Sequence, residues 1–160
     1  MAKQADKKTN AMRELERANQ PYQAHWFECP EAVSGVEVAR ILNEDPDVVF
    51  KTLVTVGKSG EHYVFMVPVA MELDLKKAAN AVGEKSIHML KSKELLGLTG
   101  YVHGGCSPLG MKKLFTTTID ESAVLYERII FSGGRIGCQI ETSLSSLKAA
   151  IPVSEADITA

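Results

Sequence analysis

Residues 48–56 read VVFKTLVTV, residues 63–69 read YVFMVPV, and the polar segment GKSGEH lies between the two runs. β-Branched and aromatic residues dominate both runs, which is typical of strands, and a short segment containing glycine and serine is typical of the turn between paired strands. These residues therefore predict a β-hairpin that is buried on at least one face, and the rest of the fold is built around it.

The segments on either side of this hairpin predict a mixture of helices and strands. Ser34 and Glu37 have the spacing of a capping box, and Asp74 and Ser143 are typical helix N-caps. Helices are expected over residues 10–19, 74–82 and 92–96 and after Ser34 and Ser143, and strands over 22–27, 86–89, 114–119, 126–131 and 136–140. This order, without strict alternation, predicts an α+β fold with a mixed, largely antiparallel sheet that is open or closed into a barrel.

Length and composition predict one globular domain over residues 1–160. The chain is 45% apolar and 24% charged, and its net charge of −2 excludes a protein that holds long nucleic acid by electrostatics alone, although a small RNA end stays open. The cysteines at positions 29, 106 and 138 form no C-x-x-C pair, which favours reduced thiols. The first ten residues, MAKQADKKTN, lack the apolar stretch of a signal peptide, and no apolar run is long enough to span a membrane. We therefore expect a soluble, cytoplasmic protein.

Residues 104–110 read GGCSPLG and form the first candidate site. Glycine lets a backbone approach a ligand closely, and inward-facing amide groups form a nest for an anion or an oxyanion. The same residues are also compatible with a simple tight turn between two elements. Considered alone, the motif does not distinguish an anion-binding loop from a tight turn.

Residues 132–137 read SGGRIG and form a second glycine cluster, between two predicted strands. It supplies the hydroxyl group of Ser132 and the guanidinium group of Arg135, and we expect that it faces the first loop. The alternative is a hairpin turn with a bulge.

Lys51 is the most informative charged residue because it interrupts an apolar strand. A fully buried ammonium group is unfavourable unless it is paired or reaches a cleft, which makes Lys51 a candidate site residue. The alternative is an edge-strand lysine that protects against aggregation. Lys112 and Lys113 are candidates for phosphate contacts, but a solvated pair is the simpler interpretation.

The histidines at positions 25, 62, 88 and 103 share no ligand spacing with each other or with the cysteines, so no metal site is expected. His103 and Cys106 suggest a Cys-His nucleophile pair or a redox thiol, because an amide nest activates a thiolate. Two residues three apart in a loop rarely orient each other, however, and no third orienting group is evident.

Four motifs occur in order along the chain: VFKTL at 49–53, LDLKK at 73–77, GYVHGGCSPLG at 100–110 and SGGR at 132–135. Together they resemble the YbaK/EbsC family of Cys-tRNA(Pro) deacylases, and the match extends from about Tyr22 to Leu147. The resemblance implies a mixed β-barrel flanked by helices, related to the editing domain inserted in bacterial prolyl-tRNA synthetase.

The resemblance also implies a substrate and a mechanism. The substrate is cysteine mischarged on proline tRNA, which a synthetase pocket separates poorly from proline because the two amino acids are similar in size. In the family's usual mechanism the substrate thiol attacks its own ester and leaves a thiolactone, so neither a protein nucleophile nor a cofactor is needed. The aminoacyl-tRNA acceptor end and prolyl-tRNA synthetase are the implied partners.

Site residues follow from the same resemblance. Lys51 holds the aminoacyl-adenosine end, and backbone amides from Gly104 to Pro108 stabilise the oxyanion, while Ser132 and Gly133 line the opposite wall. The expected catalytic residues are Lys51, Gly104, Gly105 and Ser132, and the expected substrate-binding residues are Phe27, Cys106, Ser107, Pro108, Gly133, Gly134, Arg135 and Gln139.

Two departures from the family pattern concern specificity. Phe27 stands where better-known members carry a tyrosine, and Gln139 stands where many relatives carry an aspartate. A pocket that has lost these polar groups is compatible with alanine or another small amino acid, or with a non-catalytic module that binds the tRNA end or the synthetase.

Overall fold

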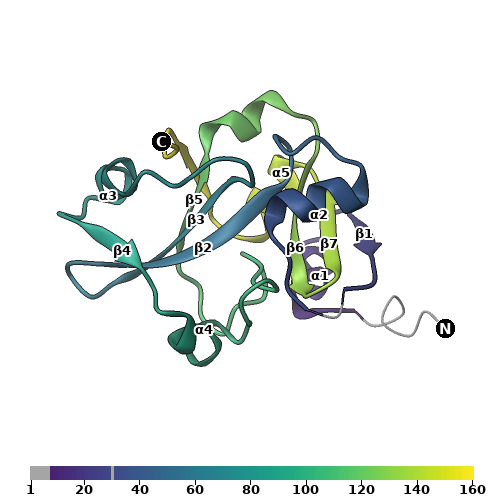
Figure 1. Cartoon of the computed structure of the whole chain (residues 1–160), viewed down its shortest axis with the longest axis horizontal. Coiled ribbons are helices and arrows are strands. Elements are labelled where there is room, and N and C mark those ends of the chain that lie inside the picture. Colours follow the sequence, from purple (N-terminus) through teal and green to yellow (C-terminus); the bar gives the residue numbers. More distant parts are fainter. Residues whose placement is uncertain (1–7, 30) are drawn as a thin grey trace.

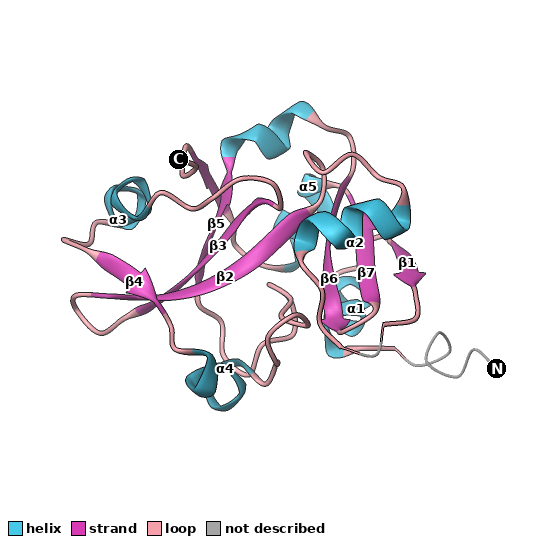
Figure 2. Ribbon diagram, in the orientation of Figure 1, coloured by secondary structure: helices cyan, strands magenta, loops and turns pink. Residues whose placement is uncertain are grey.

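The computed structural model describes residues 8–29 and 31–160. Its strands form two sheets, one of three strands in the order β1-β7-β6 and one of five strands in the order β4-β2-β3-β5-β8. Figures 1 and 2 show the five-stranded sheet on one side of the molecule and the three-stranded sheet with its helices on the other. The segment 1–7, in which no signal peptide was expected, lies outside the described residues.

The predicted hairpin is confirmed as β2 (Phe50–Gly57) and β3 (His62–Pro68), which pair antiparallel from Phe50 opposite Pro68 to Val56 opposite His62. β3 is central in its sheet, so both of its edges are paired, and the burial of consecutive residues along it shows that both of its faces are covered as well. The run from Val64 to Val67 is at most 1% exposed, which explains why this strand is apolar without alternation.

The remaining strands of the large sheet are short. β4 (Ile87–Met89) pairs antiparallel with the end of β2, while β5 (Thr116–Asp120) pairs parallel with β3. β8 (Ser154–Ala156) pairs parallel with β5 and was not expected from the sequence, because a strand of three largely polar residues carries no hydrophobic pattern.

The small sheet consists of β1 (Gln23–Trp26), β6 (Ile129–Arg135) and β7 (Cys138–Thr142). Helices α1 (Asn10–Arg17) and α5 (Leu144–Ala150) pack together against one face, where their apolar side chains join a core with those of the strands. Helix α2 (Gly35–Leu42) crosses the other face (Figure 1), and its Ala39 packs with Val49, Val69 and Ile130.

The two sheets meet at a bridge between Val49 and Ile130, where the amide of Ile130 donates to the carbonyl oxygen of Val48 at 2.9 Å. Four of the six strand pairings are antiparallel and two are parallel. The α+β class and the mixed, largely antiparallel pairing are therefore confirmed, with the strands divided between two joined sheets.

The expected N-caps are confirmed. The side chains of Ser34, Asp74 and Ser143 accept hydrogen bonds from the first turns of α2, α3 (Leu75–Val82) and α5. Only half of the capping box forms, because the carboxylate of Glu37 pairs with Arg40.

The boundaries of several other elements differ from the sequence prediction. Helix α4 (Ser92–Thr99) is three residues longer than expected, and a 3-10 helix over Glu121–Leu125 delays β6 until Ile129. None of the described helices is long and apolar enough to span a membrane.

Candidate functional site

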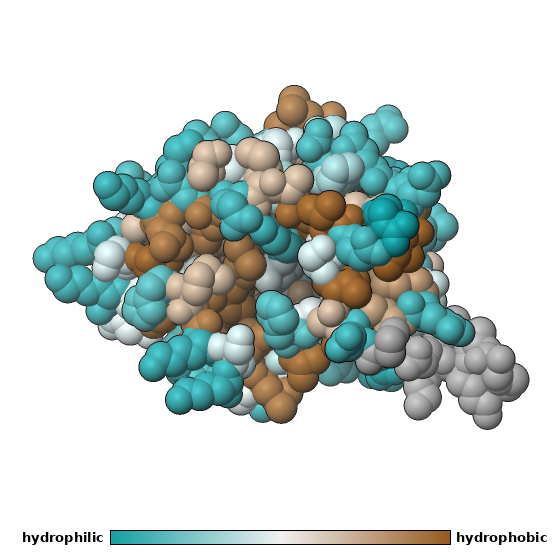
Figure 3. Space-filling model, viewed as in Figure 1, coloured by the Kyte–Doolittle hydropathy of each residue, from teal (hydrophilic) through white to brown (hydrophobic). Residues whose placement is uncertain are grey.

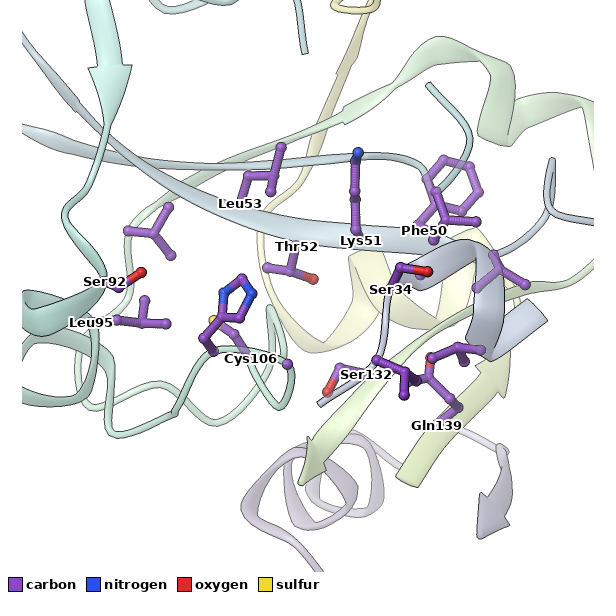
Figure 4. Close-up of a pocket in the computed structure, with 18 of the residues that line it drawn as sticks. Ser34, Phe50, Lys51, Thr52, Leu53, Ser92, Leu95, Cys106, Ser132 and Gln139 are labelled. Carbon is purple, nitrogen blue, oxygen red and sulfur yellow. The ribbon is translucent and has the colours of Figure 1, made fainter. Parts of the chain in front are cut away.

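A cavity of about 510 Å³ opens where the two sheets meet. Ser92 and Leu95 of α4 lie on one side of it and Ser132 and Gln139 of the small sheet lie on the other, with Thr52 of β2 between them (Figure 4). The space-filling view shows a hollow bordered by hydrophobic surface in the middle of this face (Figure 3). A cavity of this size suits a ligand of the size of a nucleoside.

The outer edge of β2 is interrupted at this cavity. Along an antiparallel strand, successive residues direct their backbone groups to alternate edges. The carbonyl oxygen of Val49 faces β3, where it accepts from Val69, whereas those of Val48 and Val54 face the outer edge and accept from Ile130 and Leu90.

Between these two outer contacts, the backbone groups of Thr52 also face the outer edge. Among the described residues β2 has only β3 and β4 as strand partners, and β4 reaches no further than Thr55. The cavity therefore has a wall with open backbone hydrogen-bonding positions, available to a ligand.

The side chain of Thr52 adds a second unpartnered group. Its Oγ1 atom is buried and has no hydrogen-bond partner in the described part of the chain. A buried hydroxyl group without a partner is unfavourable and is the exception in folded proteins, and because Thr52 lines the cavity, its hydroxyl group is a candidate for a hydrogen bond to a ligand. Thr52 lies within the VFKTL motif but was not among the predicted site residues, although a hydroxyl residue in an apolar strand was an available signal.

Lys51 lines the same cavity, but its ammonium group lies near the carboxylate of Glu72. Lys51 and Thr52 project to opposite sides of β2 (Figure 4), and the Lys51 Nζ atom is 3.5 Å from the carboxylate of the exposed Glu72. The outer edge of the strand is unpaired at this position, so Lys51 is both an edge-strand lysine and a pocket residue. It lies at the rim, and contact with a ligand depends on its flexible side chain.

The first glycine loop contributes two of its residues directly. Gly104 and Cys106 line the cavity, and Gly104 has a φ of +87° and no room for a side chain, because a Cβ would lie 2.5 Å from the Cβ of Ala32. The amide of Gly105 is already bonded to the carbonyl oxygen of Val102 at 3.0 Å.

Ser107 and Pro108 lie beneath the loop rather than in the cavity wall. Both are buried, and the hydroxyl group of Ser107 accepts from the amide of Leu109 at 3.3 Å, which holds the turn. Pro108 has no N–H group, so it contributes no amide to an oxyanion nest. Of the loop residues named from the sequence, the structure brings Gly104 and Cys106 to the pocket and leaves Gly105, Ser107 and Pro108 outside its lining.

Tyr101 holds the two glycine clusters together. Its hydroxyl group donates to the carbonyl oxygen of Leu109 at 2.6 Å, and a Cβ on Gly110 or Gly134 would lie 2.6 or 3.1 Å from atoms of its ring and hydroxyl. A Cβ on Gly105 would likewise lie 3.3 Å from the backbone of Arg135. The expectation that the two clusters face each other is confirmed. Tyr101, the residue between them, was not among the predicted site residues.

The second cluster is a hairpin with a bulge, as one of the two alternatives predicted. The register of β6 and β7 shifts between Ser132 and Arg135, and Gly134 has a φ of +95°. Ser132 nevertheless lines the cavity, while the exposed Arg135 and the glycines at 133 and 134 lie outside its lining. Gly133 is required for packing, since a Cβ there would lie 2.5 Å from the Sγ atom of Cys138.

Gln139 and Phe27 have different positions. Gln139 is 7% exposed and lines the cavity beside Ser132, its cross-strand partner in the small sheet. Its side-chain amide forms no hydrogen bond within the described chain. Phe27 is half-buried and lies after the end of β1, where its amide donates to the carbonyl oxygen of Gly137 at 2.9 Å. Phe27 is therefore outside the pocket lining.

Cys106 is poorly suited to act as a nucleophile. Burial raises the pKa of its thiol to about 12, so the thiol is protonated near neutral pH. His103 lines the same cavity, but no hydrogen bond joins it to Cys106 among those of the described residues. In that part of the chain no three potential metal ligands cluster.

These features define an α+β domain with a substrate pocket at the junction of two sheets. Residues 29–149 match the model of the aminoacyl-tRNA editing domain. The chain belongs to this family.

Individual relatives agree with this assignment. The chain is 43% identical over 158 residues to EbsC of Enterococcus faecalis (strain ATCC 700802 / V583), which is named as a candidate Cys-tRNA(Pro)/Cys-tRNA(Cys) deacylase, and the match covers 98% of this chain and 96% of EbsC. The fold is also similar to that of the hypothetical protein APE2540, with a TM-score of 0.87, 20% identity, and coverage of 95% of this chain and 100% of the other. A candidate trans-editing enzyme for prolyl-tRNA synthetase gives a TM-score of 0.80 at 23% identity, with coverage of 96% and 99%. At these identities the two structures support the fold alone.

Proposed function

We propose that this protein is an aminoacyl-tRNA deacylase that acts in trans and clears cysteine from mischarged Cys-tRNA(Pro). The observation that carries the proposal is a set of polar groups in the pocket wall that bond to no other described residue: the open backbone edge at Thr52 and the buried Thr52 hydroxyl group, with the side-chain amide of Gln139 nearby in the lining. An ester and an α-amino group have the donors and acceptors that such a wall needs. The name of the EbsC relative supports cysteine as the amino acid.

The proposed reaction uses the substrate's own thiol. The thiol sulfur attacks the ester carbonyl carbon, a C–S bond forms, and the C–O bond to the terminal ribose breaks. The thiol proton passes to the leaving ribose oxygen, which yields cysteine thiolactone and free tRNA. The protein contributes orientation and oxyanion stabilisation, for which Gly104 and Cys106 are the loop residues placed at the cavity.

Roles for individual residues are part of the same proposal. Lys51, at the rim, contacts the phosphate or ribose of the terminal nucleotide when its side chain leaves Glu72, and Ser132 lines the wall opposite α4. The free thiol of Cys106 is a wall group and not the nucleophile, because its pKa is raised to about 12. A cytoplasmic site of action and cooperation with prolyl-tRNA synthetase complete the proposal.

A second candidate is a deacylase for Ala-tRNA(Pro) or for another small amino acid. The observation that favours it is the neutral Gln139 in the pocket wall, together with the position of Phe27 outside the lining. A wall without a carboxylate or a tyrosine hydroxyl group has fewer polar groups that distinguish a thiol side chain from a methyl group.

The test is a deacylation panel. Purified protein is incubated with Cys-tRNA(Pro) and Ala-tRNA(Pro), each with and without prolyl-tRNA synthetase. We expect cysteine to be released fastest, and preferential release of alanine supports the second candidate. No release above the buffer rate from either substrate, with the synthetase present, contradicts both.

A further inference from the structure

One segment of the chain has a charge opposite to that of the whole. Residues 85–113 carry five lysines and one glutamate, which gives this segment a net charge of +4 in a chain of net charge −2 and leaves −6 for the remainder. The segment runs from β4 through α4 to the end of the first glycine loop, and we call it the basic segment. Its lysines are at positions 85, 91, 93, 112 and 113.

The basic segment also forms one wall of the pocket. Met89, Ser92, Leu95, Gly104 and Cys106 all belong to it and line the cavity. Hydrophilic residues gather over α4 beside the central hollow (Figure 3). The segment with the net positive charge is therefore also a wall of the pocket.

The lysines of this segment differ in what they contact. The ammonium group of Lys112 donates to the carbonyl oxygen of Gly97 at 3.3 Å, at the end of α4, and that of Lys113 lies 5.8 Å from the ring centre of Phe115. Lys91 and Lys93 are exposed, flank the pocket residue Ser92, and form no ion pair with another described residue. Lys85 is also exposed, but Lys91 and Lys93 flank a pocket residue, so their ammonium groups are the ones beside the opening for a ligand that leaves the pocket.

The size of the cavity limits what enters it. About 510 Å³ accommodates an amino acid and its terminal adenosine, so the nucleotides before the terminal one must lie on the protein surface. Their phosphates favour the border formed by the basic segment, because the rest of the chain is acidic. An acidic surface of the synthetase is the alternative partner for the same lysines.

We propose that Lys91 and Lys93 form the exit path for the acceptor strand of the substrate tRNA and bind its phosphate backbone just outside the pocket. This inference rests on the proposed function, because it assumes that a tRNA end occupies the cavity. The two lysines would give this acidic protein a local RNA-binding surface. The protein would then bind tRNA weakly even without the synthetase.

The test compares Lys91→Gln/Lys93→Gln with the matched control Arg13→Gln/Lys58→Gln, which removes the same charge from exposed positions of α1 and of the turn after β2 that form no ion pair with another described residue. We measure the Kd for uncharged tRNA(Pro) by fluorescence anisotropy over a salt series, and the KM for Cys-tRNA(Pro) and for the cysteinyl ester of adenosine, without synthetase. For the lysine variant we expect a Kd and a KM for tRNA about tenfold higher at low salt, a log-log salt slope smaller by about 1.5, and a KM for the adenosine ester within twofold of wild type.

The outcomes separate this inference from the proposed function. If wild type releases cysteine but the lysine variant matches the control in Kd, KM and salt slope, the exit path is wrong and the function stands. If lysine-dependent binding occurs without any cysteine release, the function is wrong and the RNA surface stands. If the lysine variant loses activity only when synthetase is present, the lysines bind the synthetase and the inference is overturned.

Discussion

The hydroxyl group of Tyr101 donates to the carbonyl oxygen of Leu109 over 2.6 Å, and this buried bond fixes the tyrosine ring to the first glycine loop. Leu109 is fully buried, and Gly134, from the β6–β7 hairpin, packs against the same ring. The wall of the pocket opposite β2 therefore depends on one tyrosine that does not line the pocket itself.

Tyr101→Phe is expected to lower the free energy of unfolding by about 1–2 kcal/mol, because the buried carbonyl oxygen of Leu109 loses its donor. Urea denaturation measures this change. Tyr63→Phe is the matched control, since the Tyr63 hydroxyl group bonds to the carboxylate of Glu84 in a more exposed position and its loss is expected to matter less. Equal losses in the two variants contradict the bracing role of Tyr101.

Thr52→Val is expected to reduce kcat/KM for deacylation about tenfold or more without lowering stability. The hydroxyl group of Thr52 has no partner in the free protein, so its removal costs no internal hydrogen bond, whereas the bond to substrate is lost. Thr55→Val, on the same strand, should lower stability and leave kcat/KM unchanged, because the Thr55 hydroxyl donates to the carbonyl oxygen of Tyr63 at 3.0 Å. If Thr52→Val leaves the rate unchanged, Thr52 does not contact the substrate.

Lys51→Ala is expected to lower kcat/KM at least tenfold with little change in thermal stability, because its only described ion pair, with Glu72, is exposed and contributes little to folding. Two variants serve as controls. Glu72→Gln breaks the same pair and Lys77→Ala breaks the similar pair with Asp157. Wild-type turnover in Lys51→Ala would remove this residue from the site.

Cys106→Ala is expected to retain kcat/KM within about threefold, whereas loss of a true nucleophile costs several orders of magnitude. The reason is that the Cys106 thiol, with a pKa raised to about 12, supplies almost no thiolate at neutral pH. Steady-state deacylation of Cys-tRNA(Pro) measures the effect. A loss of a thousandfold or more restores the thiol-enzyme hypothesis.

Stability is expected to fall as the pH rises from about 9 towards 12. Burial raises the pKa of Cys106 and Cys138 to about 12 in the folded state, while the ordinary thiol value is near 9. Both thiols stay protonated in the folded state over this window, whereas the unfolded state ionises, so each contributes a loss of order 1 kcal/mol per pH unit. Urea denaturation between pH 8 and 10 should show a smaller slope for Cys106→Ala than for wild type, and an unchanged slope contradicts the shift.

The hairpin, the N-caps and the positions of both glycine clusters follow from the sequence because each depends on neighbouring residues. The runs at 48–56 and 63–69 are apolar enough to predict strands wherever they pack, and Ser34 caps its own helix. β8 could not be predicted from the sequence, because its pairing with β5 depends on backbone contacts rather than on a side-chain pattern.

The pocket itself depends on long-range geometry. Thr52 is a site candidate only because the contact with β6 stops at the Val49–Ile130 bridge on one side of it and β4 reaches no further than Thr55 on the other, and neither limit is visible near residue 52. Ser107 and Pro108 were expected in the site because of their motif, but the loop turns them inward, where Gly110 packs against the start of α1 and its amide bonds to Glu14 at 3.1 Å.

The most direct test of the account compares Cys-tRNA(Pro) with Ser-tRNA(Pro) under single-turnover conditions. The two substrates differ by one atom, and only the thiol is a strong nucleophile towards its own ester. We predict that cysteine is released at least about a hundredfold faster and that cysteine thiolactone is the first product. Equal release of the two amino acids, or release of free cysteine without a thiolactone, would contradict it.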